Sequence, residues 1–226
     1  MKIKGKFYYL LFSLLLLLIV YPIVGKCISA DRMLVLFFSF ILLSSIRAVM
    51  GQRPIKVIIG LILALPAIIL IWLDQFFINR DVHITARLFL VVFSFFTVGC
   101  IVSFLMKAKR VNSDMLSGAA SAYLLIGISW SILYDLLEKV APGSLAFSDK
   151  MGADMVTMWP LFNYYSFVTL TTIGYGDITP ITLQAQSLSI LEAVTGVLFI
   201  ALLISRLVGM HLYQINNSEE PNALDK

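Results

Sequence analysis

The chain has 226 residues, of which 60% are hydrophobic and only 13% are charged, and its mean hydropathy is +0.94. Soluble domains are usually about 25% charged, so this composition excludes an ordinary soluble protein and predicts a protein of the lipid bilayer. The net charge of +4 is small, so we expect no nucleic-acid partner, and the sequence indicates no particular soluble partner. The sequence contains no metal-ligand cluster, nucleophile constellation or phosphate-binding loop, so we expect neither an enzyme nor an organic cofactor.

Six hydrophobic runs are each close to the twenty residues that a helix needs to cross a bilayer. They cover residues 7–24, 33–50, 55–73, 87–106, 115–137 and 183–208. A shorter apolar piece at 159–171 fits a re-entrant segment better than a span, and Pro160 suits its first turn, where a missing N–H costs no hydrogen bond. We therefore predict an all-α membrane protein with six transmembrane helices, a re-entrant helix and a following loop.

The first hydrophobic run has a second interpretation. Lys2, Lys4 and Lys6 precede it and small residues follow it near position 29, which is also the layout of a secretory signal peptide. The run is longer than the apolar core of a typical signal peptide, so we expect it to remain as a span. Neither interpretation changes the side of the membrane on which the later loops lie.

Lys and Arg residues are divided unequally between the two ends of the predicted spans. At one end are Lys2, Lys4, Lys6, Arg47, Arg53, Lys56, Lys107, Lys109, Arg110, Arg206 and Lys226. At the other end are Lys26, Arg32, Arg80, Arg87, Lys139 and Lys150. Cytoplasmic loops carry the excess of basic residues, so we expect a multi-pass protein of the cell inner membrane or plasma membrane. Both termini are then cytoplasmic, and the loop 138–182 is extracytoplasmic.

A polar link at 107–114 divides the chain into a four-span module, residues 1–110, and a second half, residues 111–226. In a voltage sensor, several basic residues cross the membrane field, because each charge contributes only about 2.3 kcal/mol per 100 mV. No Lys or Arg lies between Arg87 and Lys107, which bound the fourth span. We therefore expect weak voltage dependence or none.

The second half contains the run TIGYGD at residues 172–177, between the re-entrant segment and the last span. This run resembles the selectivity filter of potassium channels. The resemblance implies that the main-chain carbonyl groups of Thr172, Ile173, Gly174 and Tyr175 bind dehydrated K⁺, with Gly176 ending the filter. Gly174 and Gly176 tolerate positive φ without Cβ strain, so the loop can alternate hands and keep its carbonyl groups aligned. The side chains at 173 and 175 would then point away from the ion.

Residues 111–226 resemble the pore domain of bacterial potassium channels over essentially their whole length, with an outer helix, a turret, a pore helix, a filter and an inner helix. The first half resembles such channels only in its number of spans. The resemblance implies a homotetramer, because each chain supplies one quarter of the carbonyl ring. It also implies passive K⁺ transport, with K⁺ ions as the only ligand.

The pore-helix segment provides candidate supports for the filter. Tyr164 and Tyr165 stand where the family often has a Trp pair that packs against the filter tyrosine, and a Tyr hydroxyl could donate a hydrogen bond toward Tyr175. Thr169 and Thr171 are either supports or ordinary packing hydroxyls.

Asp177 is the carboxylate that follows the filter. Some relatives pair it with an acid at the position that Val168 occupies here. We therefore expect Asp177 to lack that partner.

The last span contains four candidate gating residues and one buried acid. Gly196 lies where the family has a hinge glycine, and either bending or close helix packing explains a glycine in mid-helix. Ile200, Ile204 and Ser205 recur at helical spacing, and they either line the cavity and inner gate or face lipid or the core. Glu192 is a carboxylic acid inside an apolar span, and we expect it to face the pore helix and bond to Tyr or Thr hydroxyls.

Two alternatives to a selective potassium channel stay open at this point. One is a weakly selective cation channel, in which the tyrosines at 164 and 165 do not brace the filter. The other is a non-conducting regulatory or receptor subunit, whose four-span half binds a lipid or a partner.

Overall fold

The computed structural model describes residues 7–24, 30–49, 54–76, 80–108, 112–148 and 158–219. Several basic residues used above to orient the chain lie outside these ranges, namely Lys2, Lys4, Lys6, Lys26, Arg53, Lys109, Arg110, Lys150 and Lys226. The described basic residues do divide between two ends. Arg47 and Lys107 lie in the last turns of their helices, whereas Arg32 and Arg80 lie at the starts.

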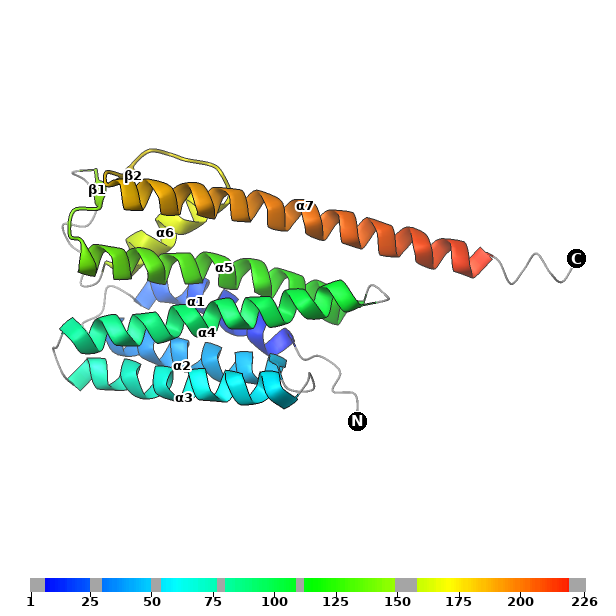
Figure 1. Cartoon of the computed structure of the whole chain (residues 1–226), viewed down its shortest axis with the longest axis horizontal. Helices are drawn as coiled ribbons and strands as arrows, with labels where there is room; N and C mark the ends of the chain where they lie inside the picture. Colours follow the sequence, from blue (N-terminus) through cyan, green and yellow to red (C-terminus); the bar gives the residue numbers. More distant parts are fainter. Residues whose placement is uncertain are drawn as a thin grey trace, which may run out of the picture.

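The described ranges hold seven α-helices and two short strands. In chain order these are α1 (Tyr8–Val24), α2 (Ala30–Val49), α3 (Pro54–Phe76), α4 (Arg80–Lys107), α5 (Ser113–Val140), β1 (Leu145–Phe147), α6 (Trp159–Leu170), β2 (Ile178–Pro180) and α7 (Leu183–Glu219). Six of the helices run side by side with alternating directions, and the short α6 lies between α5 and α7 near the end where the strands are (Figure 1). The chain is all-α apart from the strand pair, as predicted.

Five helices are long and apolar enough to cross a membrane. Their candidate spans are Arg32–Val49, Pro54–Phe76, Arg80–Lys107, Ser113–Val140 and Leu183–Met210. Helix α1 has 17 residues, which is about 25 Å at 1.5 Å per residue, somewhat less than the bilayer core of about 30 Å. The sixth span therefore stays a prediction. Helix α6 has 12 residues and Pro160 in its first turn, as the sequence predicts.

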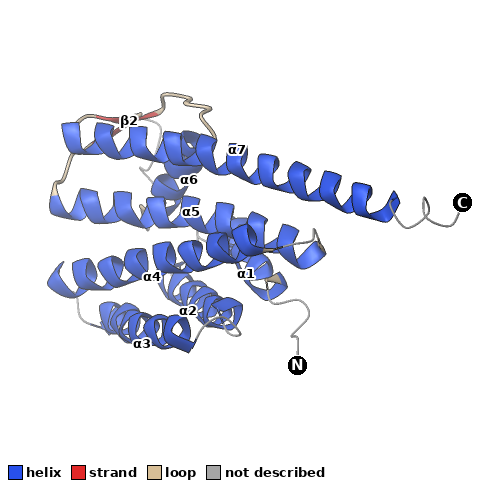
Figure 2. Cartoon of the chain, turned by 45° about the vertical axis from the view of Figure 1, so that its right-hand side comes forward, coloured by secondary structure: helices blue, strands red, loops and turns tan. Residues whose placement is uncertain are grey.

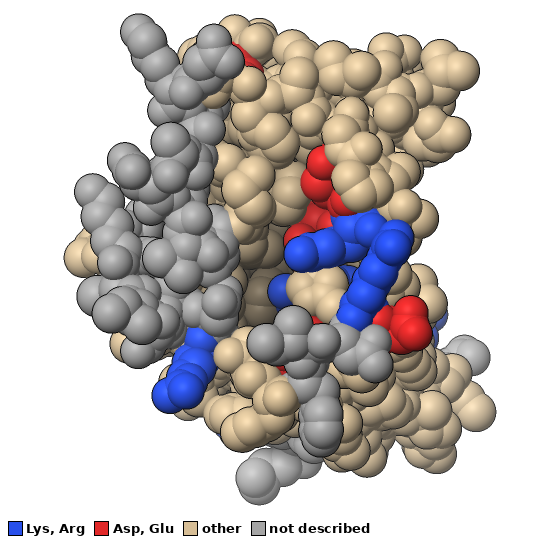
Figure 3. Space-filling view, turned by 90° about the vertical axis from the view of Figure 1, so that its left-hand side faces the viewer, with Lys and Arg blue, Asp and Glu red and all other residues tan. Residues whose placement is uncertain are grey.

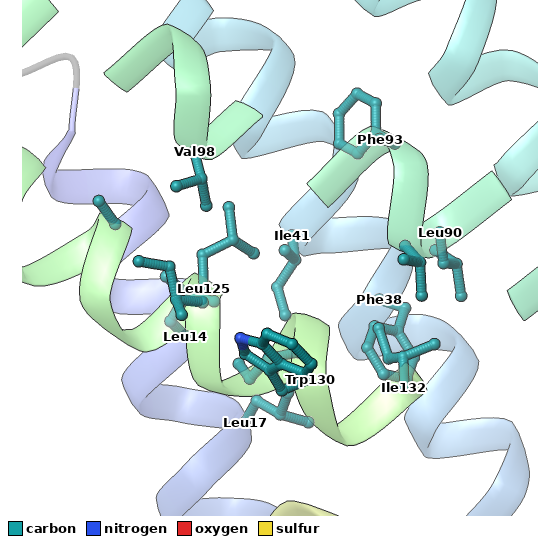
Figure 4. Packing of buried hydrophobic residues seen from close by; sticks show 14 of the residues in the cluster. Leu14, Leu17, Phe38, Ile41, Leu90, Phe93, Val98, Leu125, Trp130 and Ile132 are labelled. Carbon is teal, nitrogen blue, oxygen red and sulfur yellow. The ribbon is translucent and has the colours of Figure 1, made fainter. Parts of the chain in front are cut away.

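Helix α5 is the centre of the molecule, and 72% of its span is buried. In Figure 4, Trp130 of α5 lies beside Leu17 of α1, and Ile132 of α5 lies beside Phe38 of α2, with Leu90 of α4 nearby; all of these are buried. Trp130 of α5 thus lies in the interior of the helix bundle, away from any surface that lipid could cover. The same helix also contacts α6 and α7, so α5 joins the first four helices to the rest of the chain. The domain boundary near residue 110 stays a prediction.

Helix α7 has the opposite character, because only 11% of its apolar span is buried. It continues without a break for 37 residues and extends well past the neighbouring end of α5 (Figure 2). Its large exposed apolar side chains are Leu183, Ile190, Leu191, Val194, Val197, Leu198, Ile200, Leu202, Ile204 and Val208. Such a long apolar surface requires lipid or other protein chains to cover it.

The two strands form a small antiparallel sheet that the sequence did not predict. Phe147 pairs with Ile178 and Leu145 with Pro180, so the residues that follow the filter run are hydrogen-bonded to the turn after α5. That turn is organised by Glu138, whose carboxylate accepts the main-chain N–H groups of residues 143–145. Gly143 has φ +81° there. The end of the loop at residues 171–177 is therefore fixed to the turn that follows α5.

Charged side chains gather at the end of the molecule where the strands lie (Figure 3). Arg87 of α4 donates from Nε to the Asp135 carboxylate of α5 at 2.7 Å, and both side chains are largely buried. His83 of α4 lies between Asp135 and Asp74, with ring nitrogens 3.4 and 2.9 Å from their oxygens. This cluster joins α3, α4 and α5.

Candidate functional site

In the loop after α6, the sign of the backbone angle φ alternates from one residue to the next. Thr172 has φ +59°, Gly174 +60° and Gly176 +79°, whereas Ile173 and Tyr175 do not have positive φ. Successive peptide groups in such an alternating conformation carry their N–H groups on one side and their carbonyl groups on the other. The positive φ expected at both glycines is confirmed.

The N–H groups of this loop point into the end of α6. Thr172 donates to the carbonyl oxygen of Thr169 at 2.9 Å, and Ile173 donates to that of Val168 at 3.0 Å. The N–H of Gly174 reaches the same Val168 oxygen at 3.4 Å. In a planar trans peptide the carbonyl group points opposite to the N–H of the next residue. The carbonyl groups of Thr172 and Ile173 therefore point away from α6.

These carbonyl groups face the outside of the single chain. Residues 171–176 are exposed, and within the described part of the chain no hydrogen bond ends on the main-chain oxygens of residues 172–175. Figures 1 and 2 both place the loop beside α7, at the edge of the molecule far from α3. The loop thus presents a row of unpaired main-chain oxygens on the same side as the exposed face of α7.

Thr172 is the one feature of the loop backbone that the sequence did not predict. A β-branched residue with positive φ is unusual, and the left-handed conformation costs about 1–2 kcal/mol for a residue with a Cβ. The hydroxyl of Thr172 bonds to the carbonyl oxygen of Thr171 at 2.7 Å. The only sequence signal is the periodicity, because position 172 lies two residues before Gly174.

Tyr164 contacts the loop in a different way from the one expected. Its ring stacks on the Tyr175 ring with an interplanar angle of 2° and 6.4 Å between centroids. Its hydroxyl donates to the Asp177 carboxylate at 2.6 Å rather than to Tyr175. The expected packing against Tyr175 is confirmed. The hydrogen bond that a Tyr hydroxyl could donate toward Tyr175 is not formed by Tyr164 within the single chain. Asp177 lacks an acidic partner at position 168, as expected, and has the Tyr164 hydroxyl as a partner that the sequence did not predict.

Replacing Tyr164 by Phe separates the two contacts. The ring and its stack on Tyr175 remain, but the charge-assisted hydrogen bond to Asp177 is lost. We expect Y164F to keep K⁺ flux but to lose current faster during sustained conduction in planar bilayers. Unchanged persistence of the current would show that this bond does not hold the loop.

Tyr165 supports a different part of the molecule from the one expected. Its hydroxyl bonds to Ser189 of α7 at 2.7 Å, and its ring meets that of Tyr134 edge-on at 4.9 Å. Among the described residues no ring contact joins it to Tyr175. Tyr165 therefore connects α6 with α5 and α7 and does not contact the filter tyrosine.

The two pore-helix threonines differ in what they contact. The hydroxyl of Thr171 donates to the carbonyl oxygen of Phe167 in its own helix at 2.6 Å. The main-chain oxygen of Thr169 accepts the Thr172 N–H at 2.9 Å. Thr169 thus holds the start of the loop through its backbone, and Thr171 caps the helix.

Gly196 lies where α7 crosses the end of α6. A Cβ at this position would be 2.1 Å from the carbonyl oxygen of Leu170, which no side chain could relieve by rotating. Of the two explanations for this glycine, close packing is therefore supported by the geometry. Bending at Gly196 stays a prediction.

Ile200, Ile204 and Ser205 follow Gly196 along α7 and are exposed in the single chain. Residues four and eight positions after Gly196 lie near its helix face, so the two isoleucines lie toward the side of α7 on which Gly196 meets α6. The Ser205 hydroxyl bonds back to the carbonyl oxygen of Ala201 at 2.8 Å. A position in the chain's own core is thus excluded for these three residues.

Glu192 is fully buried between three helices. Its carboxyl group bonds to the hydroxyl of Tyr134 on α5 at 2.6 Å and to the hydroxyl of Ser166 on α6. The expectation that it faces the pore helix is confirmed, although the tyrosine comes from α5 and the α6 partner is a serine. No pattern in the sequence singled out Tyr134, Ser166 or Ser189, because isolated hydroxyl groups are common in apolar helices.

Comparison with known proteins supports a channel. Residues 124–211, from α5 to α7 and less than half of the chain, match a protein family described as ion channel. Two-pore potassium channel 4 of Arabidopsis thaliana is 37% identical over 62 residues, which are 27% of this chain and 22% of that protein. No solved structure matches. The chain therefore carries an ion-channel domain with similarity to a potassium channel, which points to a membrane channel and not to an enzyme.

Proposed function

We propose that the protein is a K⁺-selective channel that conducts passively through a homotetrameric pore in the cell inner membrane or plasma membrane. The observation that carries the proposal is the row of unpaired carbonyl groups at residues 172–175, of which those of Thr172 and Ile173 point away from α6. Rings of such oxygens replace the water around a dehydrated K⁺ ion. With four chains around one axis, each would supply one quarter of every ring.

The exposed surface of the single chain supports four chains rather than one. The loop lies beside α7 (Figure 1), and both expose apolar side chains in the single chain. Irregular backbone at membrane depth is tolerated only when protein buries it or a water-filled path lies beside it. Tyr175 is 67% exposed and Ile173 is 55% exposed. Neighbouring subunits would cover these side chains, while Ile200, Ile204 and Ser205 would line the cavity and inner gate.

The first four helices contribute no array of gating charges in this proposal. Arg87 is paired with Asp135 at one end of α4, and no basic residue follows until Lys107 at the other end. Opening would depend weakly on voltage or not at all. With α1 as the sixth span, both termini would be cytoplasmic, and α6 with its loop would form the re-entrant segment.

The test is ion flux from the purified protein in liposomes. We expect K⁺ efflux that Ba²⁺ blocks, much smaller Na⁺ flux, and a tetramer by native mass spectrometry. Comparable K⁺ and Na⁺ flux would replace the proposal by a weakly selective cation channel. A well-folded protein without flux of either ion would favour a non-conducting regulatory or receptor subunit.

A further inference from the structure

The carboxyl group of Glu192 is buried without a positive partner. Within the described ranges no Lys, Arg or His forms an ion pair with it, and its surroundings are hydroxyl groups of Tyr134 and Ser166. An ionised carboxylate is very costly in an apolar interior unless a charge or several donors compensate it.

The hydrogen atoms of this cluster can be counted. The hydroxyl of Tyr134 supplies one, to Glu192 Oε2. The oxygen of Ser166 lies 2.6 Å from the carbonyl oxygen of Gly127 and also contacts Glu192 Oε1. A hydroxyl group has one hydrogen and a main-chain carbonyl only accepts. If Ser166 donates to Gly127, the hydrogen between Ser166 and Glu192 must come from Glu192.

We propose that Glu192 is a neutral carboxylic acid that positions the pore helix. Glu192, which lies on α7, donates to Ser166 of α6 and accepts from Tyr134 of α5. These two bonds hold α6 against α5. The inference deepens the proposed function and rests on it for its effect on selectivity, because α6 carries the loop whose carbonyl groups meet the ion. Glu192 touches no ion and acts only through α6.

The surrounding contacts leave α6 little room to move. A Cβ on Gly127 of α5 would lie 2.6 Å from the Phe167 ring, and one on Gly196 of α7 would lie 2.1 Å from the oxygen of Leu170.

The hydroxyl groups next to this cluster are paired in the same way. Ser189 donates to the carbonyl oxygen of Ala185 at 2.7 Å, so the hydroxyl hydrogen between Tyr165 and Ser189 comes from the tyrosine. Every hydroxyl hydrogen of the cluster then has one acceptor.

Loss of the proton from Glu192 would reverse one bond. Ser166 would have to donate to the carboxylate and could no longer donate to Gly127. The contact between α6 and α5 would then bring together two oxygens with no hydrogen between them. A neutral group with one donor and one acceptor is therefore what this position requires.

Glu192→Gln and Glu192→Ala test whether a neutral hydrogen-bonding group is sufficient at this position. The glutamine amide can donate to Ser166 and accept from Tyr134, so we expect E192Q to match the parent in thermal unfolding and in the K⁺ to Na⁺ permeability ratio. In E192A both bonds are lost, and we expect that ratio to fall about tenfold, the scale of one or two buried hydrogen bonds.

Infrared spectroscopy of the detergent-solubilised protein reads the proton directly. We expect the C=O stretching band of a protonated carboxyl group at neutral pH in the parent, and its loss in E192Q. Glu138→Gln is the matched control, because the Glu138 carboxylate only accepts, from the N–H groups of the outer turn. E138Q should keep the band.

Two results would overturn the inference. One is that the parent and E192Q spectra do not differ in the C=O band of a protonated carboxyl group. The other is that E192Q is as unstable as E192A. Both are measured without ion flux. A parent that folds but does not conduct would refute the proposed function alone, and the infrared and unfolding results would still decide the role of Glu192.

Discussion

Replacing Gly174 by alanine should abolish K⁺ flux from reconstituted protein. Gly174 has φ +60°, and a Cβ in that conformation costs about 1–2 kcal/mol. Four copies in a tetramer add to about 4–8 kcal/mol, whereas about 1.4 kcal/mol already changes an equilibrium tenfold. We expect the loop to leave the alternating conformation, so that its carbonyl groups no longer face one axis. Efflux from liposomes should fall more than about a hundredfold.

Gly143→Ala is the matched control for this prediction. Gly143 has φ +81°, and like Gly174 it has open space where a Cβ would go. The strain per chain is therefore similar, but the residue lies in the turn before β1. We expect G143A to lower stability and to keep its K⁺ flux. Equal loss of flux in both variants would mean that the effect comes from general strain, and normal flux in G174A would refute the filter assignment.

Replacing Gly196 by alanine should disrupt the junction between α6 and α7. The added Cβ would lie 2.1 Å from the Leu170 carbonyl oxygen, so the two backbones must separate. Overpacking of this kind typically costs about 1–3 kcal/mol and sometimes more, and the upper end applies because main chain must move. We expect a lower melting temperature, loss of the tetramer in detergent and little K⁺ flux.

The same helix offers a control glycine at position 209, where a Cβ would meet nothing within 4 Å. Alanine is a better helix former than glycine by about 1 kcal/mol, so G209A should be as stable as the parent or more so. A G196A protein that assembles and melts normally but opens differently would favour a hinge at Gly196 over a packing contact.

The sequence predicted the parts of this protein that depend on local chemistry. The apolar runs gave the long helices, because every backbone polar group in a bilayer must be satisfied within the helix. Pro160 correctly marked the start of α6. Gly174 and Gly176 correctly marked positive φ, because only glycine adopts it without strain.

The contacts between helices could not be predicted in the same way. The partner of Asp177 depends on which face of α6 Tyr164 occupies once the loop has turned back. The sequence identified no partner for it, because position 168, where some relatives have an acid, is a valine here. Tyr165, the neighbour of Tyr164 in sequence, points to Ser189 instead. The neighbours of Glu192 come from helices 58 and 26 residues away in sequence, and hydroxyl groups at such separations carry no periodic signal.

The amino-acid sequence by itself determined the membrane setting, the helices and a loop whose glycines permit carbonyl groups on one side, because hydrophobic length and backbone sterics are local properties. Only the tertiary structure decided that the N–H groups of this loop turn into α6, that Gly196 is a contact and that Glu192 joins three helices. Those outcomes depend on the distances between helices. These distances are set by side-chain packing between the helices and not by the local sequence.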